Sequence, residues 1–287
     1  MTFSISKDVL LNTLQLLSKA IPTRSTLPII NCALFTQKNN KINIRTTNLE
    51  ISISITCDID NDIKNLDEKN AIAIPMNKLL EITTAMPEGK IEFSVSDIGK
   101  VTINCQQGQY TIMGQSKEEF PKEQNVKNGT IFNINGKELK NIIKNTSYAA
   151  SKDDLKPVLQ GVLFQIKEKG FVSVATDGHR LVKFEIKDFK TKNYNGSVVV
   201  PTKFLTILNN HIEEENEASM IIGDNHIQIK LVNGNITSRI IKDPYPDYES
   251  VIPKDNNKML IVDKNLFTEA IKRVSIFSNK LSQQVAL

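Results

Sequence analysis

Two stretches of the sequence decide the fold: residues 3–17 read FSISKDVLLNTLQLL, and residues 132–146 read FNINGKELKNIIKNT. Each stretch begins with alternating apolar and polar residues, which is typical of a strand with one buried face. Each continues with apolar residues three and four positions apart, which is typical of an amphipathic helix. The two stretches begin 129 residues apart, so a strand that leads directly into a helix recurs at the spacing of a domain.

The same order of features continues after these first helices. In both halves an apolar strand ends in proline and leads into a second helical pattern. A proline at the first helical turn is tolerated because its missing N–H would have no partner there. The matched pairs lie 125 to 129 residues apart: Thr47-Asn48 with Thr176-Asp177, residues 72–75 with residues 198–201, Gly108 with Gly234, and Phe120-Pro121 with Tyr245-Pro246. Matches kept in order over this length predict two complete repeats of about 120 residues each.

A third copy of the strand and helix begins at residue 260, 128 residues after the second copy. It stops before the second strand of the repeat, so we expect an incomplete third domain, left by an artificial truncation or by a natural short form. The expected domains are residues 1–122, 129–249 and 254–287. The predicted fold class is α+β, tandem repeats with two helices each on an antiparallel sheet, since alternating strands bury one sheet face and leave the other to water.

The composition excludes several classes of protein. Apolar residues make up 40% of the chain and charged residues 24%, the balance of a globular protein. No run approaches the ~18 apolar residues that a membrane helix needs, and the N-terminus has no signal-peptide pattern, so we expect neither membrane insertion nor secretion. The three cysteines, Cys32, Cys57 and Cys105, form no CxxC pair. We therefore predict no disulfide scaffold, no metal site and a cytoplasmic location.

The most unusual local string is Ala175-Thr176-Asp177-Gly178-His179-Arg180-Leu181. One interpretation is catalytic, with Asp177 and His179 as an acid–base pair and Arg180 as an anion clamp. The other is a tight turn between strands, for which aspartate and glycine supply the geometry. The first repeat keeps the turn at Thr47-Asn48 without the His-Arg pair, which favours a structural turn that carries a binding surface. No nucleophile motif accompanies the string, so we expect no catalytic residue, and a hydrolase is the rival hypothesis.

Basic residues recur on the predicted helices. The net charge is only +4, from 36 basic and 32 acidic side chains, so the chain as a whole is mildly basic. Lysines on a helix are usually a solvated face, but equivalent helices that line one surface would add their charges. Arg24 lies in a loop after the first helix, from which a guanidinium can reach a phosphate. The candidate phosphate-contacting residues are Arg24, Lys140, Lys144, Lys203 and Arg273.

Four motifs, in order along the chain, resemble those of the β subunit of bacterial DNA polymerase III, the sliding clamp family. They are residues 24–29, residues 175–181, residues 245–248 and residues 273–279. Each motif alone is weak, but the ordered set on a repeated domain is highly specific. The resemblance implies tandem repeats of the DNA-clamp fold in a six-domain ring. In that ring two subunits join head to tail, helices line the central hole and sheets form the outer wall.

The resemblance also implies a function. A DNA polymerase processivity factor encircles double-stranded DNA without sequence specificity, catalyses nothing and needs no cofactor. Weak phosphate contacts suit such a ring, because topology retains it on DNA and strong base readout would stop it from sliding. The implied partners are the replicative polymerase catalytic subunit, the clamp loader and repair polymerases, all through short linear motifs. The alternative is a shortened clamp fragment that binds peptides without closing a ring.

Two further sites follow from the resemblance. The implied partner-peptide pocket is lined by Leu159, Thr176, Gly178, His179, Arg180, Leu181, Pro246, Ser250 and Val251. Ser250 departs from a family pattern that often has arginine there, and the family's C-terminal tail has no counterpart, so we expect weakened peptide affinity. The implied dimer interface includes Tyr110, Ile276 and Phe277. Its completing strands have no counterpart either, so we expect these 287 residues to be monomeric or to associate irregularly.

Overall fold

The computed structural model describes residues 1–60, 71–191, 194–279 and 284–285. Its internal contacts divide the chain into two compact units, Met1–Tyr245 and Pro246–Leu287, and each is described by itself. The larger unit contains both stretches quoted above, and the smaller unit contains the third copy of the pattern. Within the described ranges, no helix has the length and apolar character needed to cross a membrane.

The first half of the larger unit begins with the predicted strand and helix. Ser6 caps the helix, because its hydroxyl accepts a hydrogen bond from the Val9 amide at 3.3 Å, and Asp8 lies in the first turn, where a carboxylate is favourable. The helices are α1 (Lys7–Leu17) and α2 (Met76–Ala85). The strands are β1 (Thr2–Ser6), β2 (Cys32–Lys38), β3 (Lys41–Thr47), β4 (Ile51–Asp58), β5 (Ala71–Pro75), β6 (Lys90–Val95), β7 (Lys100–Cys105), β8 (Gly108–Met113) and β9 (Gln115–Ser116).

The second half repeats this order, with Asn135 in the capping position of its first helix. The helices are α3 (Gly136–Thr146) and α4 (Thr202–His211). The strands are β10 (Thr130–Asn135), β11 (Gly161–Ile166), β12 (Lys169–Thr176), β13 (Leu181–Lys190), β14 (Gly196–Pro201), β15 (Glu217–Ile222), β16 (His226–Leu231) and β17 (Gly234–Arg239). The smaller unit has one α-helix among its described residues, α5 (Lys264–Ser275), capped by the Asp263 carboxylate.

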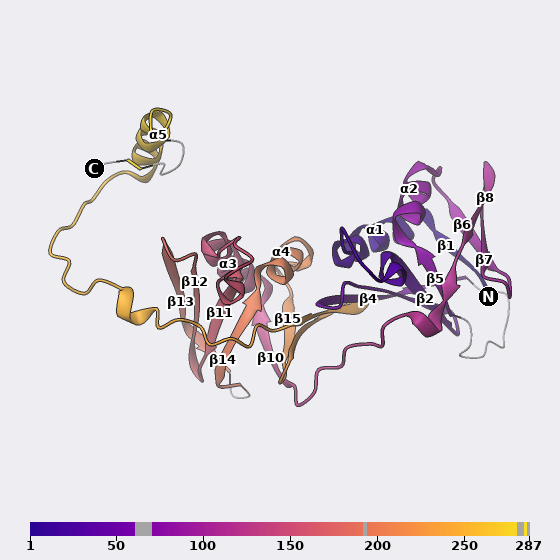
Figure 1. The fold of residues 1–287 in the computed structure, drawn as a ribbon, viewed down its shortest axis with the longest axis horizontal. Helices are drawn as coiled ribbons and strands as arrows, with labels where there is room; N and C mark the ends of the chain where they lie inside the picture. The colour runs from indigo at the N-terminus through magenta and orange to yellow at the C-terminus, as the bar shows by residue number, and fades with distance from the viewer. Residues whose placement is uncertain (61–70, 192–193, 280–283, 286–287) are drawn as a thin grey trace. The chain divides into compact units, whose positions relative to one another are not determined.

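The strands form antiparallel sheets, and one sheet passes from the first half of the larger unit into the second (Figure 1). Two sheets are four-stranded, with the orders β1-β6-β7-β8 and β13-β12-β11-β14. The third is nine-stranded, with the order β10-β15-β16-β17-β4-β3-β2-β5-β9. Its two halves join where β17 pairs with β4, with Gly234 opposite Ile55 and Ser238 opposite Ile51. The two repeats therefore share a continuous hydrogen-bonded sheet.

The joint between β17 and β4 requires a very close approach of two backbones. A Cβ atom at Gly234 would lie 2.0 Å from the carbonyl oxygen of Ser54, closer than any side chain tolerates. Two backbone bonds extend the joint beyond the paired strands: Thr56 donates to the Asn233 oxygen at 2.7 Å, and Arg239 donates to the Glu50 oxygen at 2.8 Å. The pairing of β17 with β4 therefore requires glycine at position 234.

Figure 1 shows α1, α2, α3 and α4 together on one side of the larger unit. There α1 and α2 pack on strands of the nine-stranded sheet, and α3 and α4 pack mainly on strands of the four-stranded sheet β13-β12-β11-β14. α1 packs on α2 and β4, and α3 packs on α4 and β13. The apolar stripes predicted from the helical spacing are buried at 0–4% exposure: Leu10, Leu14, Leu17, Leu139, Ile142 and Ile143. Each repeat therefore places two helices against antiparallel strands, which confirms the predicted α+β class.

Two local expectations differ from the structure. Pro75 and Pro201 each end a strand in the position just before a helix, rather than lying inside its first turn. The apolar residues 260–262 form no strand, although they correspond to the strand that opens the other two repeats. Among the described residues of the smaller unit no strand is present to pair with them, and a strand needs such a partner because its amides and carbonyls must find hydrogen bonds.

Candidate functional site

The string singled out in the second repeat forms a compact turn between β12 and β13. The Thr176 hydroxyl donates to the Arg180 oxygen at 2.7 Å and accepts from the Gly178 amide at 3.1 Å. The Asp177 carboxylate accepts from the amides of His179 and Arg180, both at 3.0 Å. Gly178 has a φ of +90°, a conformation that glycine adopts without strain. The turn thus fixes its backbone through two short side chains.

The first repeat builds nearly the same turn between β3 and β4. The Thr47 hydroxyl donates to the Ile51 oxygen at 3.0 Å and accepts from the Leu49 amide at 3.0 Å. The Asn48 side chain accepts from the amides of Glu50 and Ile51 at 3.0 and 2.7 Å. Because both repeats use a threonine and an Asx side chain in this way, the turn is a structural element of the repeat.

Arg180 and its surroundings distinguish the second turn from the first. Its guanidinium Nε donates to Asp177 at 3.1 Å, while another guanidinium nitrogen donates to the Tyr148 oxygen at 2.7 Å. The guanidinium also lies 5.8 Å from the Tyr148 ring centre, within cation–π range. The Arg180 backbone amide, with further help from the His179 amide and the Arg180 charge, holds the pKa of Asp177 below its usual value. A carboxylate of this kind stays ionised and orients the arginine.

The catalytic interpretation of the string finds no support in this geometry. The hydrogen bond that links Asp177 with His179 starts from the backbone amide of His179, not from its imidazole ring. A general acid–base pair needs a side-chain contact or a shared proton path. Both oxygens of the Asp177 carboxylate are already engaged within the turn. Asp177, His179 and Arg180 form the hydrogen bonds of the turn instead.

The predicted pocket residues belong to two different compact units. Leu159 is 9% exposed, and its backbone is fixed by bonds with Ser151 and Lys156 in the short segment before β11. Residues 176–181 lie in the turn described above, in the same unit as Leu159. The remaining three residues, Pro246, Ser250 and Val251, lie in the smaller unit, where the Ser250 hydroxyl donates to the Asp247 oxygen at 2.7 Å. Membership of these three residues in one pocket with the turn stays a prediction.

Two tyrosines near the turn were absent from the predicted site. The Tyr148 ring is 59% exposed beside Arg180, and no local motif around it marks it as functional. The Tyr245 hydroxyl donates to the Val174 oxygen at 3.4 Å, and burial raises the pKa of Tyr245 to about 12. Tyr245 belongs to a motif quoted from the sequence, so its neighbourhood was recognisable, whereas the Tyr148 contact joins residues 32 positions apart.

The candidate phosphate contacts lie on helices or loops of both units. Arg24 is exposed in the loop after α1, Lys144 is exposed on α3 and Lys203 is exposed in the first turn of α4. Lys140, one turn before Lys144, is partly screened because its ammonium lies 3.6 Å from the Glu214 carboxylate. Arg273 is exposed on α5 in the smaller unit. Four of the five cations thus belong to the larger unit, whose helices lie together on one side of its sheets.

Two strand edges of the larger unit correspond to the strands of its internal joint. By the repeat spacing, β8 is the counterpart of β17, and β13 is the counterpart of β4. Both β8 and β13 end their sheets, with no partner strand on their outer side among the described residues. Tyr110 lies on β8 and is 40% exposed. In the smaller unit, Ile276 and Phe277 follow α5 and are 78% and 90% exposed. The larger unit therefore has, at its two open sheet edges, one strand that corresponds to β17 and one that corresponds to β4.

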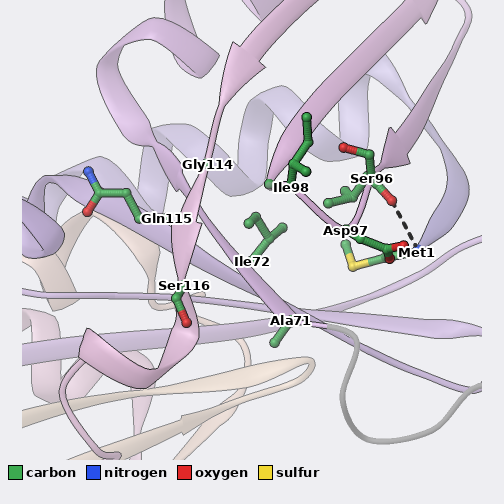
Figure 2. Close-up of a pocket in the computed structure, with 11 residues that line it drawn as sticks. Met1, Ala71, Ile72, Ser96, Asp97, Ile98, Gly114, Gln115 and Ser116 are labelled. Carbon is green, nitrogen blue, oxygen red and sulfur yellow. Dashed lines mark hydrogen bonds between the residues drawn. The ribbon is translucent and has the colours of Figure 1, made fainter.

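A hollow of about 510 Å³ lies beside the end of β8, between the turn at residues 96–99 and the start of β9 (Figure 2). Its ionisable groups are Asp97 and the N-terminal ammonium of Met1, which donates to the Val95 oxygen at 3.5 Å. None of the predicted site residues lines it. Over the described ranges, no cluster of three or more histidine, cysteine, aspartate or glutamate side chains is arranged to hold a metal ion.

The sequence matches two known domain families. The family "DNA polymerase III beta subunit, N-terminal domain" matches residues 1–124, and "DNA polymerase III beta subunit, central domain" matches residues 133–247. The chain belongs to the DNA polymerase III beta subunit family. This confirms the resemblance found in the sequence, and the repeated turn and repeated strand–helix units are features of two successive domains of that subunit.

Individual members of the family are similar along nearly the whole chain. The beta sliding clamp of Staphylococcus aureus is 28% identical over 286 residues, which cover 98% of this chain and 75% of that protein. The beta sliding clamp of Pseudomonas putida is 25% identical over 288 residues, which cover 100% and 77%. The crystal structure of the DNA polymerase III subunit beta from Pseudomonas aeruginosa has a TM-score of 0.90 at 26% identity, with 98% and 76% covered. The chain spans about three quarters of the length of these relatives.

Proposed function

We propose that this chain is a sliding clamp, a non-catalytic processivity subunit that holds a DNA polymerase on duplex DNA. The observation that carries the proposal is the sheet joint, in which β17 of the second repeat pairs with β4 of the first. A joint of this kind adds repeats head to tail while it keeps their helices on the same side of the sheets. Repetition of the same joint produces a closed ring if the rotation between repeats is right.

The DNA contacts proposed for this ring are electrostatic. Arg24, Lys140, Lys144, Lys203 and Arg273 would face phosphates, since they project from the helices and the loop after α1. Contacts of this kind carry no sequence information. Their small number keeps the attraction weak at physiological salt, because each neutralised phosphate adds to the salt dependence of binding. The ring then remains on DNA by enclosing it, and it moves because no base contact holds it.

The proposed ring closes through the edges that the internal joint leaves unused. The β8 edge with Tyr110 is the counterpart of β17, so it would pair with a strand equivalent to β4 in a neighbouring repeat. In the head-to-tail homodimer proposed for the complete subunit, this neighbour is the third repeat of a second copy, to which Ile276 and Phe277 contribute apolar contacts. For these 287 residues alone, the prediction stays a monomer or irregular association. Two copies then form two identical junctions related by a twofold axis.

The turn at residues 176–181 is proposed as the anchor of partner peptides. Its fixed backbone and the oriented Arg180 offer polar groups, and the half-buried Leu181 at the end of the turn offers an apolar contact. The nearly buried Leu159 is proposed as a further apolar wall. An extended peptide with a glutamine and large apolar residues fits such a surface. The proposed partners are the catalytic subunit of the replicative polymerase, the clamp loader and repair polymerases. The proposed location is the cytoplasm, where bacterial DNA is replicated.

The substitution His179→Ala tests the peptide site. The His179 side chain is exposed and leaves the turn's hydrogen bonds intact when truncated, since only its backbone takes part in them. We expect about tenfold weaker binding of a labelled peptide that carries glutamine, leucine and phenylalanine, as is typical for loss of an important contact residue. Fluorescence anisotropy with the wild-type chain and the variant measures the change.

The matched control is Glu50→Ala, which truncates the residue at the corresponding place in the first repeat's turn. This variant should bind the peptide like the wild type, because the proposed pocket belongs to the second repeat alone. Equal losses in the two variants, or no loss in His179→Ala, would contradict the assignment. Hydrolytic activity that is present in the wild type and absent from His179→Ala would instead support the rival hydrolase.

The alternative of a peptide-binding fragment without ring closure is less well supported. The sheet joint and the helix cations have no use in a module that only binds peptides. The similarity to beta sliding clamps extends over 98–100% of the chain and is not confined to the second repeat. Both features favour the clamp.

A further inference from the structure

A separate hollow lies on the first repeat, on the face of β2, β3 and β4 that is turned away from the helices. Alternate residues of these strands point to opposite faces. Phe35, Ile42, Ile44 and Ile55 enter the main core. The residues between them face outward and line a hollow of about 710 Å³, together with the β2–β3 hairpin and Glu123. No predicted site residue lies in it, and it is far along the sequence from the turn at residues 176–181.

Arg45 is the residue that makes this hollow unusual. It is only 9% exposed, and its guanidinium donates one hydrogen bond, to the Pro121 oxygen at 2.8 Å, and lies 5.1 Å from the Phe120 ring centre. A guanidinium has five N–H donors in a planar fork. The remaining donors have no partner in the described residues, and Arg45 lines the hollow. Pro121 and Phe120 thus fix the guanidinium, and its other N–H donors remain available to a ligand in the hollow.

Other polar groups around Arg45 complete a cationic surface. Lys38 and Lys41 flank the hairpin at one end of the hollow, and the Lys41 ammonium lies 3.6 Å from the exposed Asp58 carboxylate. The Asn43 amide donates to the hydroxyls of Ser54 and Thr56, at 2.9 and 3.1 Å, so its position is fixed. Three cations, three asparagine amides and two threonine hydroxyls line the hollow, against a single carboxylate, that of Glu123.

Glu123 is the natural competitor of any anionic ligand here. Burial lowers the pKa of Arg45, and the charge of the exposed Glu123 carboxylate opposes this effect. No hydrogen bond joins the Arg45 guanidinium to the Glu123 carboxylate among the described contacts, so the two interact through space. An incoming carboxylate that docks directly on the fork would gain two parallel bonds that Glu123 does not make.

We propose that this hollow is a docking site for an acidic, extended segment of a partner protein, in which Arg45 binds a carboxylate bidentately and Lys41 faces an adjoining acidic residue. Charge complementarity selects the acidic character. The size of the hollow selects a segment of chain, because a lone phosphate ion or free amino acid would occupy only a small part of it. The amides and hydroxyls match the peptide groups of such a segment. The site is distinct from the peptide-binding turn and does not depend on it.

The test measures binding of a fluorescein-labelled oligoglutamate peptide by anisotropy, with oligoglutamine of the same length as the neutral probe. We expect oligoglutamate to bind and oligoglutamine not to bind. The substitution Glu123→Gln should tighten oligoglutamate binding several-fold, since it removes the competitor, and Lys41→Ala should weaken it by about tenfold, the value of one charge-assisted contact. Arg45→Lys, which keeps the charge but loses the fork, should weaken binding more than Lys41→Ala.

The controls separate this site from general attraction to a basic protein. Glu119→Gln and Lys100→Ala alter the same charges at exposed positions outside the hollow, and both should bind like the wild type. Arg45 also contacts Phe120 and Pro121, so its variants can fold poorly. In that case the tighter oligoglutamate binding expected for Glu123→Gln is the deciding result. Equal effects of Glu119→Gln and Glu123→Gln would overturn the proposal. Displacement of oligoglutamate by inorganic phosphate or free glutamate at equal charge concentration would also overturn the proposal. The same holds if Lys140→Ala and Lys144→Ala weaken binding while Lys41→Ala and Arg45→Lys do not.

Discussion

The substitution Gly234→Ala should lower the free energy of unfolding by about 3 kcal/mol, at the upper end of what a single added methyl group costs in a packed structure. The added Cβ would lie 2.0 Å from the Ser54 oxygen and 2.9 Å from the Ile55 side chain. The oxygen belongs to the backbone of β4, so relief requires β17 and β4 to separate. We expect the first sign of damage at this joint, and urea unfolding followed by fluorescence or circular dichroism measures it.

Gly108→Ala is the matched control for this prediction. Gly108 occupies the corresponding place in the first repeat, at the start of β8, but there the new Cβ would meet the end of the Tyr110 side chain at 3.3 Å. A phenol can move aside at the open edge of a sheet. The control should therefore change stability by about 0.5 kcal/mol or less, as surface substitutions usually do. Equal stability losses in both variants would contradict a special role for the joint.

The second large effect concerns DNA. Replacement of Arg24, Lys140, Lys144 and Lys203 by alanine should reduce affinity for a random-sequence duplex by about 100-fold at low salt and flatten the salt dependence, since each lost phosphate contact removes about 0.9 from the slope of log K against log salt. Lys140 should contribute least, because its ammonium is already 3.6 Å from Glu214. Anisotropy titrations of a labelled duplex over a salt series measure both quantities.

The control removes the same number of charges from exposed positions off the helices, at Lys100, Lys187, Lys230 and Lys242. Both quadruple variants have the same net charge, so general attraction between protein and DNA falls equally in both. We expect the control to keep most of its affinity and nearly the wild-type slope. Indistinguishable slopes for the two variants would show that the helix side of the sheet has no privileged contact with DNA.

The repeated strand and helix were predictable because their signals are local. The apolar spacing of residues 3–17 fixes α1 and its buried stripe, and residues 132–146 do the same for α3. The sheet joint was not predictable in this way. Alternation in β4 and β17 tells which side chains are buried, but not which edges meet. The pairing of Gly234 with Ile55 spans most of the larger unit and depends on how both sheets twist.

The candidate sites show the same division. The turn at residues 176–181 was predictable, because a threonine, an Asx residue and a nearby glycine specify it locally. The contact of Arg180 with Tyr148 was not, since it depends on the packing of α3's C-terminal end beside β12. Arg45 likewise gave no signal of its own. It is one basic residue in an alternating strand, and its burial results from Phe120 and Pro121 in the segment that follows β9.

Retention on circular DNA tests the central claim, that the clamp holds DNA by enclosing it, most directly. The clamp with a complete third repeat is loaded by its clamp loader onto nicked circular duplex and passed over a sizing column in high salt, before and after a restriction enzyme opens the circle. We expect the clamp to stay with the closed circle, since salt screens its weak phosphate contacts but not its topology, and to leave once the DNA is linear. Equal retention on circular and linear DNA, or release from both, would contradict it.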